Sequence, residues 1–396
     1  MTIPDKIPPS LVFDFDMFAD PRLMRDVYPG MATLFDDAPE VFYTPRNGGH
    51  WVVTDYDKIV EILKDPEHFS ARGVGQIPKV ETPVTLIPLT LDPPASVAYR
   101  QILMPRFSPR AIREMEPVIR QWACHFLDQI GDRGECEFMS EVASRFPVTV
   151  FMELMGIPMD RFDDFHALVE EFLSVIPDER RYEVSNALYG YIDDLIEARH
   201  GAPRDDLVSY LLAAQISNRP LDREELHAMC FLLILAGMDT VVNVLGFGFR
   251  ALASLPVLQQ RLQDDPTAVA GLVEEIVRLF GVSTTQRSVV SDCDFHGAPL
   301  RSGDIVHCTL PIVGWDERRN RDPDTVDVDR HERTTLAFST GAHLCLGHIL
   351  ARTEIRILLE EWVKRISRFE LAEGFQPQFR VGMVQGIRDL PLRWNA

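Results

Sequence analysis

Residues 338–347 read Phe-Ser-Thr-Gly-Ala-His-Leu-Cys-Leu-Gly, and this stretch decides what kind of chain this is. Cys345 follows a glycine-containing loop and comes directly before a helix expected over residues 346–369. Backbone N–H groups and the positive end of a helix lower the pKa of a nearby thiol and stabilise the thiolate. Gly341 and Gly347 let the backbone pass close to a flat ligand. A buried structural cysteine beside an ordinary turn is the alternative, but the fixed spacing of Phe, Gly, His, Cys and Gly is highly specific.

This spacing resembles the haem-binding loop of the cytochrome P-450 superfamily, which reads FxxGxHxCxG. The resemblance implies a haem b cofactor (iron protoporphyrin IX) whose iron is ligated by Cys345. It also implies that His343 reaches a haem propionate and that Phe338 packs beside the sulfur. Gly341 and Gly347 would lie against the haem.

A second motif lies at residues 236–240, Ala-Gly-Met-Asp-Thr, inside the longest helical pattern, expected over residues 222–255. Glycine inside a helix lowers helix stability by about 1 kcal/mol relative to alanine. An acid and a hydroxyl in an apolar helix need hydrogen-bond partners or a functional role. Taken alone, a kinked core helix whose Thr240 bonds back to a carbonyl is an equal alternative. The family motif A/G-G-x-D/E-T matches every position. By that match Ala236 borders the haem, Thr240 holds the bound oxygen and Asp239 helps deliver protons for O–O cleavage.

Glu275 and Arg278 stand three residues apart and so share a helix face. Such a pair is usually solvated, but its place between the other two motifs resembles the family's ExxR, with Arg330 as a third, structural partner. Two further arginines, Arg100 and Arg287, match family positions that bind the haem propionates, although a single arginine is usually a surface residue.

The composition excludes several classes of protein. The 396 residues are 46% hydrophobic and carry a net charge of −20, which makes nucleic-acid binding a poor hypothesis. The six cysteines form no CxxC pair, which favours a reducing compartment. The N-terminus lacks the basic and apolar regions of a signal peptide. Residues 228–249 are long enough to span a bilayer, but polar residues near the middle favour a buried core helix. We therefore expect a soluble, cytoplasmic bacterial protein without a membrane anchor.

The hydrophobic periodicity is mainly helical, with one long pattern over residues 109–200 and another over 267–280. Residues 293–308 read as two strands. No linker or repeat divides the chain. We expect a mainly α (α+β) fold, a single domain over residues 1–396, with a long central helix over the haem and small β-sheets.

Further segments resemble bacterial enzymes of the camphor 5-monooxygenase type, namely residues 11–18, 47–51, 316–318 and 343–352. Those enzymes hold the camphor ketone with a tyrosine three residues before an Ile-Pro. Here Ile87-Pro88 is preceded at that position by Val84, so a less polar terpenoid or norisoprenoid is a better candidate than camphor. By family position, the residues expected to line the substrate pocket are Val84, Leu86, Leu235, Met238, Thr240, Val282 and Ser283.

The resemblance implies a monooxygenase that inserts one atom of O2 into a C–H bond of a small hydrophobic substrate. Electrons would come from NAD(P)H through a ferredoxin reductase and a 2Fe–2S ferredoxin. A peroxide-driven peroxygenase and a non-catalytic haem sensor or carrier are the alternatives. Asp239 and Thr240 favour the O2-dependent enzyme, because only that enzyme needs a relay for activating O2.

Overall fold

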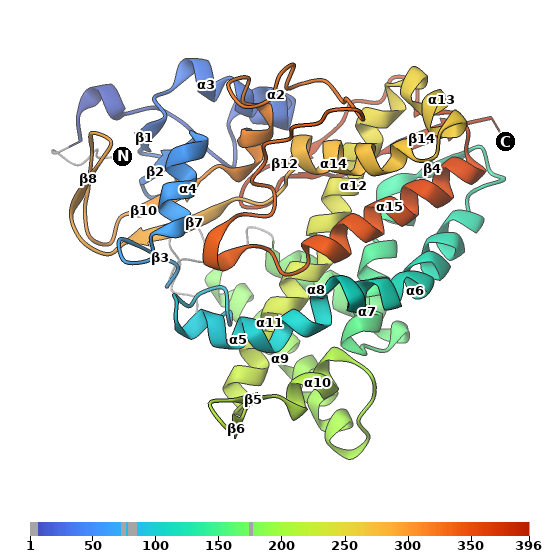
Figure 1. The fold of residues 1–396 in the computed structure, drawn as a ribbon, viewed down its shortest axis with the longest axis horizontal. Coiled ribbons are helices and arrows are strands. Elements are labelled where there is room, and N and C mark those ends of the chain that lie inside the picture. The colour runs from blue at the N-terminus through green and yellow to red at the C-terminus, as the bar shows by residue number, and fades with distance from the viewer. Residues whose placement is uncertain (1–6, 73–76, 78–84, 174–176, 396) are drawn as a thin grey trace.

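The computed structural model describes residues 7–72, 77, 85–173 and 177–395 (Figure 1). Helices make up most of it, as the sequence predicted. Those before the central pair are α1 (Pro21–Arg25), α2 (Val27–Ala32), α3 (Leu34–Asp37), α4 (Tyr56–Lys64), α5 (Ala95–Leu103), α6 (Pro109–Asp128), α7 (Phe146–Met155), α8 (Phe162–Leu173), α9 (Asp178–Gly201) and α10 (Leu207–Ala213). The others are α11 (Arg223–Met238), α12 (Thr240–Ala253), α13 (Pro256–Asp264), α14 (Ala268–Leu279) and α15 (His348–Arg365).

The strands are short and belong to small sheets. The main sheet has the order β1 (Val41–Thr44), β2 (His50–Val53), β10 (Ile305–Cys308), β7 (Thr285–Val289) and β3 (Phe69–Ser70), and only its β2–β10 pair is parallel. A second sheet joins β11 (Phe369–Leu371), β14 (Pro391–Trp394) and β4 (Glu135–Glu137). Two-stranded hairpins are formed by β5 (Gln215–Ile216) with β6 (Arg219–Pro220), β8 (Cys293–Phe295) with β9 (Ala298–Leu300), and β12 (Phe379–Arg380) with β13 (Gly386–Ile387).

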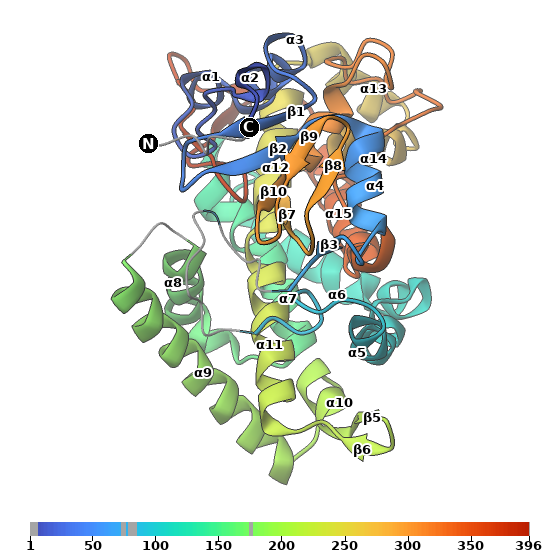
Figure 2. The same cartoon turned by 90° about the vertical axis from the view of Figure 1, so that its left-hand side faces the viewer.

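The central helix pair α11–α12 runs through the middle of the molecule, with the main sheet on one side and α5 to α10 around its lower half (Figure 2). It begins with a capping box, in which the Asp222 carboxylate accepts from the Glu225 N–H and the Glu225 carboxylate accepts from the Asp222 N–H. By length and composition, Arg223–Ala253 could cross a membrane, but 56% of its most apolar window is buried inside the protein. This burial agrees with the interpretation as a core helix.

The sequence prediction of one helix over residues 222–255 was wrong in one respect. The helix breaks at Asp239, whose φ of −127° leaves the helical region. The Thr240 hydroxyl donates to the Ala236 carbonyl at 3.1 Å, so a side chain takes part in the local hydrogen bonding. Close packing explains the glycine at position 237, since a Cβ there would lie 2.3 Å from the Phe151 ring. Both features produce a kinked helix that packs closely on α7.

Three other boundaries differ from the sequence predictions. Residues 293–308 form three strands, because left-handed backbone at His296 and Gly297 turns β8 into β9 and Gly303 permits another turn before β10. The long pattern over residues 109–200 is interrupted by β4 and by turns between four helices. The last helix, α15, covers residues 348–365 rather than 346–369, and Phe369 begins β11.

Candidate active site

The loop that ends at Cys345 is held by its own backbone. The Cys345 N–H donates to the Phe338 carbonyl at 2.9 Å, and the Leu344 N–H donates to the Gly341 carbonyl at 3.2 Å. Gly341 has a φ of +68°, and a Cβ there would lie 2.9 Å from the Leu63 carbonyl oxygen. Glycine is therefore required at this turn. The turn fixes Cys345 two residues before Gly347, which is the N-cap residue of α15.

Cys345 has an exposed surface, but protein atoms crowd its sulfur. That burial raises the pKa of the Cys345 thiol, while the Gly347 N–H and the positive charges of Arg100 and Arg352 oppose the rise. The expected lowering of the thiol pKa is therefore wrong for the cofactor-free chain, because the desolvation outweighs the helix end. A metal ion would reverse this balance, since a coordinating thiol is deprotonated by the metal charge.

Phe338 lies beside this loop, but its ring faces α15. The Arg352 guanidinium stands over the ring, 4.6 Å from the centroid, and the His348 ring lies 5.9 Å away. The Phe338 backbone contacts the cysteine through its carbonyl oxygen. Arg352 in turn pairs with Glu274 of α14 at 2.8 Å, so the loop and two helices are tied together.

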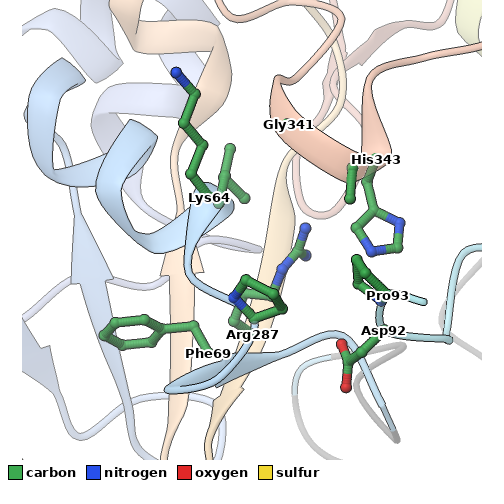
Figure 3. Close-up of a pocket in the computed structure, with 10 residues that line it drawn as sticks. Lys64, Phe69, Asp92, Pro93, Arg287, Gly341 and His343 are labelled. Atoms are coloured by element: carbon green, nitrogen blue, oxygen red, sulfur yellow. The ribbon is translucent and has the colours of Figure 1, made fainter. Parts of the chain in front are cut away.

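A cavity of about 150 Å³ lies between the loop, α4 and β7 (Figure 3). The Arg287 guanidinium and the His343 ring face this space from opposite walls, and Lys64 extends away from it (Figure 3). Burial and the nearby charges of Arg287 and Arg100 lower the pKa of His343 to about 4, so its ring is neutral at physiological pH. Asp92 lines the same cavity, but its carboxylate accepts from Ser70 and from the Ala71 N–H.

Arg287 is 4% exposed, and burial lowers its pKa. Its guanidinium donates to the Thr285 hydroxyl and the Gln286 carbonyl, and among the described residues no carboxylate lies within 4.0 Å of it. Arg100 is also partly buried with a lowered pKa, and it donates to the Leu344 carbonyl at 2.5 Å. Buried cations are normally paired. These two therefore suit a ligand that carries carboxylates, as haem does through its propionates.

The kinked part of the central helix pair is open on one side. Ala236 is exposed and Leu235, Thr240 and Val244 are only partly buried, although neighbouring turns of the same helices are buried. Space beside an apolar core helix and an exposed cysteine in a glycine-bearing loop together fit a flat, apolar ligand with an iron atom at its centre. The described residues therefore fit a haem group, and Cys345 is the residue that would ligate its iron.

Asp239 is held by residues that the sequence analysis missed. Its carboxylate accepts from Asn243 Nδ2 at 2.9 Å and from Arg380 Nη2 at 2.5 Å. Asn243 stands one helical turn after the acid and could have been suspected from the sequence. Arg380 lies in β12, far along the chain, and no local pattern marks it.

Glu275 and Arg278 are fully buried and form a bidentate pair, with distances of 2.8 and 3.0 Å. Arg330 joins them at 3.2 Å, as the sequence prediction placed it. Arg333 was missed, and its Nε donates to Glu275 Oε1 at 3.0 Å. The network ties α14 to the segment that precedes the Cys345 loop.

Of the expected pocket residues, Leu235, Met238 and Thr240 belong to the helix pair near its kink. Met238 and Val282 are buried, whereas Leu86, Leu235 and Ser283 are partly buried. Val84 lies outside the described residues. The segment that pairs with residues 282–284 was not predicted from the sequence. The Gln385 N–H donates to the Val282 carbonyl at 2.9 Å, the Thr284 N–H donates to the Met383 carbonyl at 3.0 Å, and Ser283 bridges to Val384.

The comparisons with known proteins give the family. The family model described as "Cytochrome P-450" matches residues 140–380. A relative from Sinorhizobium fredii, named probable cytochrome P-450 127A1, is 33% identical over 99% of this chain and 97% of its own length. Two solved structures superpose over the whole of both chains: CYP101J2, with a TM-score of 0.93 and 31% identity, and CYP101C1, with a TM-score of 0.92 and 28% identity. The chain belongs to the cytochrome P-450 family of haem-containing monooxygenases, which use O2 and a redox partner.

Proposed function

We propose that this chain hydroxylates a small hydrophobic substrate of the terpenoid or norisoprenoid class, with O2 and with electrons from a 2Fe–2S ferredoxin and its NAD(P)H-dependent reductase. Residues 1–396 act as one haem-thiolate domain of a soluble, cytoplasmic bacterial enzyme. The observation that carries the proposal is the placement of an exposed cysteine before α15, together with two desolvated arginines, Arg100 and Arg287, that have no carboxylate partner among the described residues.

In this proposal Cys345 ligates the iron, Arg100, Arg287 and His343 hold the propionates, and Ala236, Gly341 and Gly347 leave room for the macrocycle. Bound haem supplies the reductive activation of O2, by which one oxygen atom enters the substrate and the other leaves as water. Because Arg100 and Arg287 are partly desolvated, a propionate beside them restores the missing charge pairing.

The residues at the kink handle oxygen and protons. The Thr240 hydroxyl already donates to the Ala236 carbonyl, so its oxygen is free to accept a hydrogen bond from the open side. Asp239 stands next to it and is partly exposed, with 14% of its side-chain surface accessible. A carboxyl group in that position can take a proton from water and pass it inward. Such a relay favours an O2-dependent enzyme over a peroxide-driven one.

The pocket residues support an apolar substrate. Leu86, Leu235, Met238 and Val282 offer only hydrocarbon or thioether surface, and Val84 supplies no hydroxyl where camphor-binding enzymes have one. Relatives of 27–31% identity bear names as different as vitamin D(3) 25-hydroxylase from Pseudonocardia autotrophica and steroid C26-monooxygenase from Mycobacterium tuberculosis. Overall sequence identity therefore does not indicate the substrate, and the proposed substrate class rests on the pocket residues.

The ferredoxin is expected to dock over the cysteine loop. Leu344 exposes 41% of its surface there, and Arg100 of α5 contacts its carbonyl oxygen. A positive group beside an apolar contact suits an acidic protein partner, although the chain as a whole is strongly acidic.

The experiment is a spectral titration of the haem-loaded protein with a panel of terpenoids and norisoprenoids, followed by turnover with NADH, a ferredoxin and its reductase. The proposal predicts a substrate-induced Soret shift and a hydroxylated product that depends on O2. Product formation with hydrogen peroxide alone, at the same rate, would favour the peroxygenase. A Soret shift without any product under either condition would favour a sensor.

A further inference from the structure

Asp239 stands at the N-cap position of α12, yet its carboxylate does not cap that helix. Aspartate is favoured at an N-cap because its side chain accepts hydrogen bonds from the first free N–H groups. Here one carboxylate oxygen accepts from Asn243 Nδ2, and the other accepts from Arg380 Nη2. The carboxylate is therefore committed to two side-chain donors rather than to its own helix.

Arg380 comes from a hairpin that is pressed against the helix at this point. It pairs with Gly386 across β12 and β13. A Cβ at Gly386 would lie 2.5 Å from Asn243 Oδ1, and a Cβ at Gly246 of α12 would lie 2.6 Å from Ile387. Two glycines, one on each element, thus allow the close approach that brings Arg380 to the acid.

The ion pair lies at the boundary between solvent and the kink. The Arg380 side chain is 34% exposed and that of Asp239 is 14% exposed. The next residue, Thr240, belongs to the open side of the helix pair. The acid therefore lies between a partly exposed arginine and the residue that borders the open side of the helix pair.

We propose that Arg380 is a positioning residue for Asp239, which it holds at the water side so that the carboxyl group can take up protons and pass them toward Thr240. Each proton that leaves the carboxyl inward is replaced by one from water, so the charge of the pair is unchanged after a cycle. This rests on the proposed function of Asp239 as a proton relay.

The test uses the haem-loaded enzyme and compares Arg380→Ala with Arg380→Lys and Arg250→Ala. Arg250 is a matched control, because it lies over the Phe379 ring of the same hairpin at 5.2 Å and pairs with Asp26 at 2.6 Å. Haem content and the spectrum of the reduced, CO-bound protein are measured first. All variants are expected to retain both.

Hydrogen exchange of the hairpin amides tests whether the Arg380–Asp239 ion pair stabilises the contact between the hairpin and α12. Loss of a charge-assisted hydrogen bond is expected to speed exchange of residues 379–387 by about tenfold in Arg380→Ala, with a smaller change in Arg380→Lys. Exchange in Arg380→Ala at the wild-type rate would overturn the proposal, because Arg380 would then not stabilise the contact with Asp239.

Turnover tests the proton step, with β-ionone as the probe, NADH, a ferredoxin and its reductase. In Arg380→Ala the rate is expected to fall about tenfold, less than the roughly hundredfold or more for losing a proton donor outright, and the solvent isotope effect is expected to rise. Arg380→Lys should restore most of the rate, and Arg250→Ala should keep the wild-type isotope effect. Equal losses in Arg380→Ala and Arg250→Ala, or an unchanged isotope effect in Arg380→Ala, would reduce Arg380 to a packing residue and refute the proposal. Absence of product from the wild-type enzyme with β-ionone and the whole terpenoid panel would contradict the proposed function, and the exchange measurement would still decide the Arg380 assignment.

Discussion

Glu275→Gln tests the buried network of α14 most severely. The substitution keeps the shape of the side chain but removes its negative charge. In the wild-type chain that carboxylate accepts hydrogen bonds from Arg278, Arg330 and Arg333 and from the Asp327 N–H. Three guanidinium groups would then surround a neutral amide that also offers one unwanted donor.

The size of the effect follows from the burial of each partner. Glu275 and Arg278 are 0% exposed, so water cannot replace the lost charge between them. Arg330 and Arg333, with side chains 8% and 19% exposed, can move partly toward solvent. Breaking a buried pair costs about 3–5 kcal/mol, and the two movable arginines place this case near 3 kcal/mol. At about 2 °C per kcal/mol for a large chain, Tm should fall by roughly 6 °C.

The assay is urea unfolding of the cofactor-free protein, with the midpoint and slope recorded for both chains. Asp329→Asn is the matched control, since it breaks an exposed, solvent-screened pair with Arg261 and should change stability very little. A loss in Glu275→Gln no larger than that of the control would refute the reasoning that the network is a buried, mutually dependent unit.

The same pair of proteins gives a pH prediction. Burial raises the pKa of Glu275, but the hydrogen bonds and charges of Arg278, the Asp327 N–H and Arg330 outweigh it, so the folded-state pKa lies below 4.5. A depressed pKa contributes stability that is present above the unfolded value of 4.5 and is lost as pH falls through the folded value. Wild-type stability should therefore fall more steeply below pH 4.5 than that of Glu275→Gln. Parallel curves would contradict the assignment of the lowered pKa.

Three predictions concern turnover and binding. Thr240→Ala should keep haem and substrate binding but should consume NADH with rising peroxide and falling product. A normal yield of product per NADH in this variant would refute the role of Thr240. Asp239→Asn should instead slow overall turnover. Arg100→Ala should lower ferredoxin-dependent turnover and reduce its salt sensitivity, when the two proteins are compared at equal haem content. Unchanged ferredoxin kinetics would show that the ferredoxin docks at another surface. With Val84 in place, binding should follow apolar area at roughly 25 cal/mol per Å², so an ionone-type ketone should bind more tightly than camphor in a side-by-side Soret titration. Val84→Tyr should shift the preference toward camphor, and tighter camphor binding by the wild-type enzyme would show that another residue supplies the donor.

The parts of the molecule that the sequence predicted are those in which short segments carry their own geometry. Cys345 had to follow a turn at Gly341, because only glycine takes that backbone without strain, and the helix after it was visible from its periodicity. The spacing of Glu275 and Arg278 placed both on one helix face, and the structure shows them paired.

The parts that the sequence did not predict depend on contacts between distant segments. Arg333 and Arg380 look like ordinary surface arginines in the sequence, and only the fold brings them to Glu275 and Asp239. A kinked helix with Thr240 bonded back to a carbonyl was one of two alternatives from the sequence, and the structure has that bond. The contact of the Asp239 carboxylate with a hairpin near the C-terminus could not be predicted from the sequence. The raised pKa of the Cys345 thiol depends on burial, which a sequence motif does not measure.

The most direct test of the central claim is the spectrum of the reduced, CO-bound protein for wild type, Cys345→His and Cys293→Ser. Cys293 is a partly exposed cysteine outside the loop and serves as the control. We predict the strongly red-shifted Soret band of thiolate-ligated haem in wild type and Cys293→Ser, and its absence in Cys345→His that still contains haem. A red-shifted band that persists in Cys345→His, or that is missing from the haem-loaded wild-type protein, would contradict the assignment of Cys345 as the axial ligand.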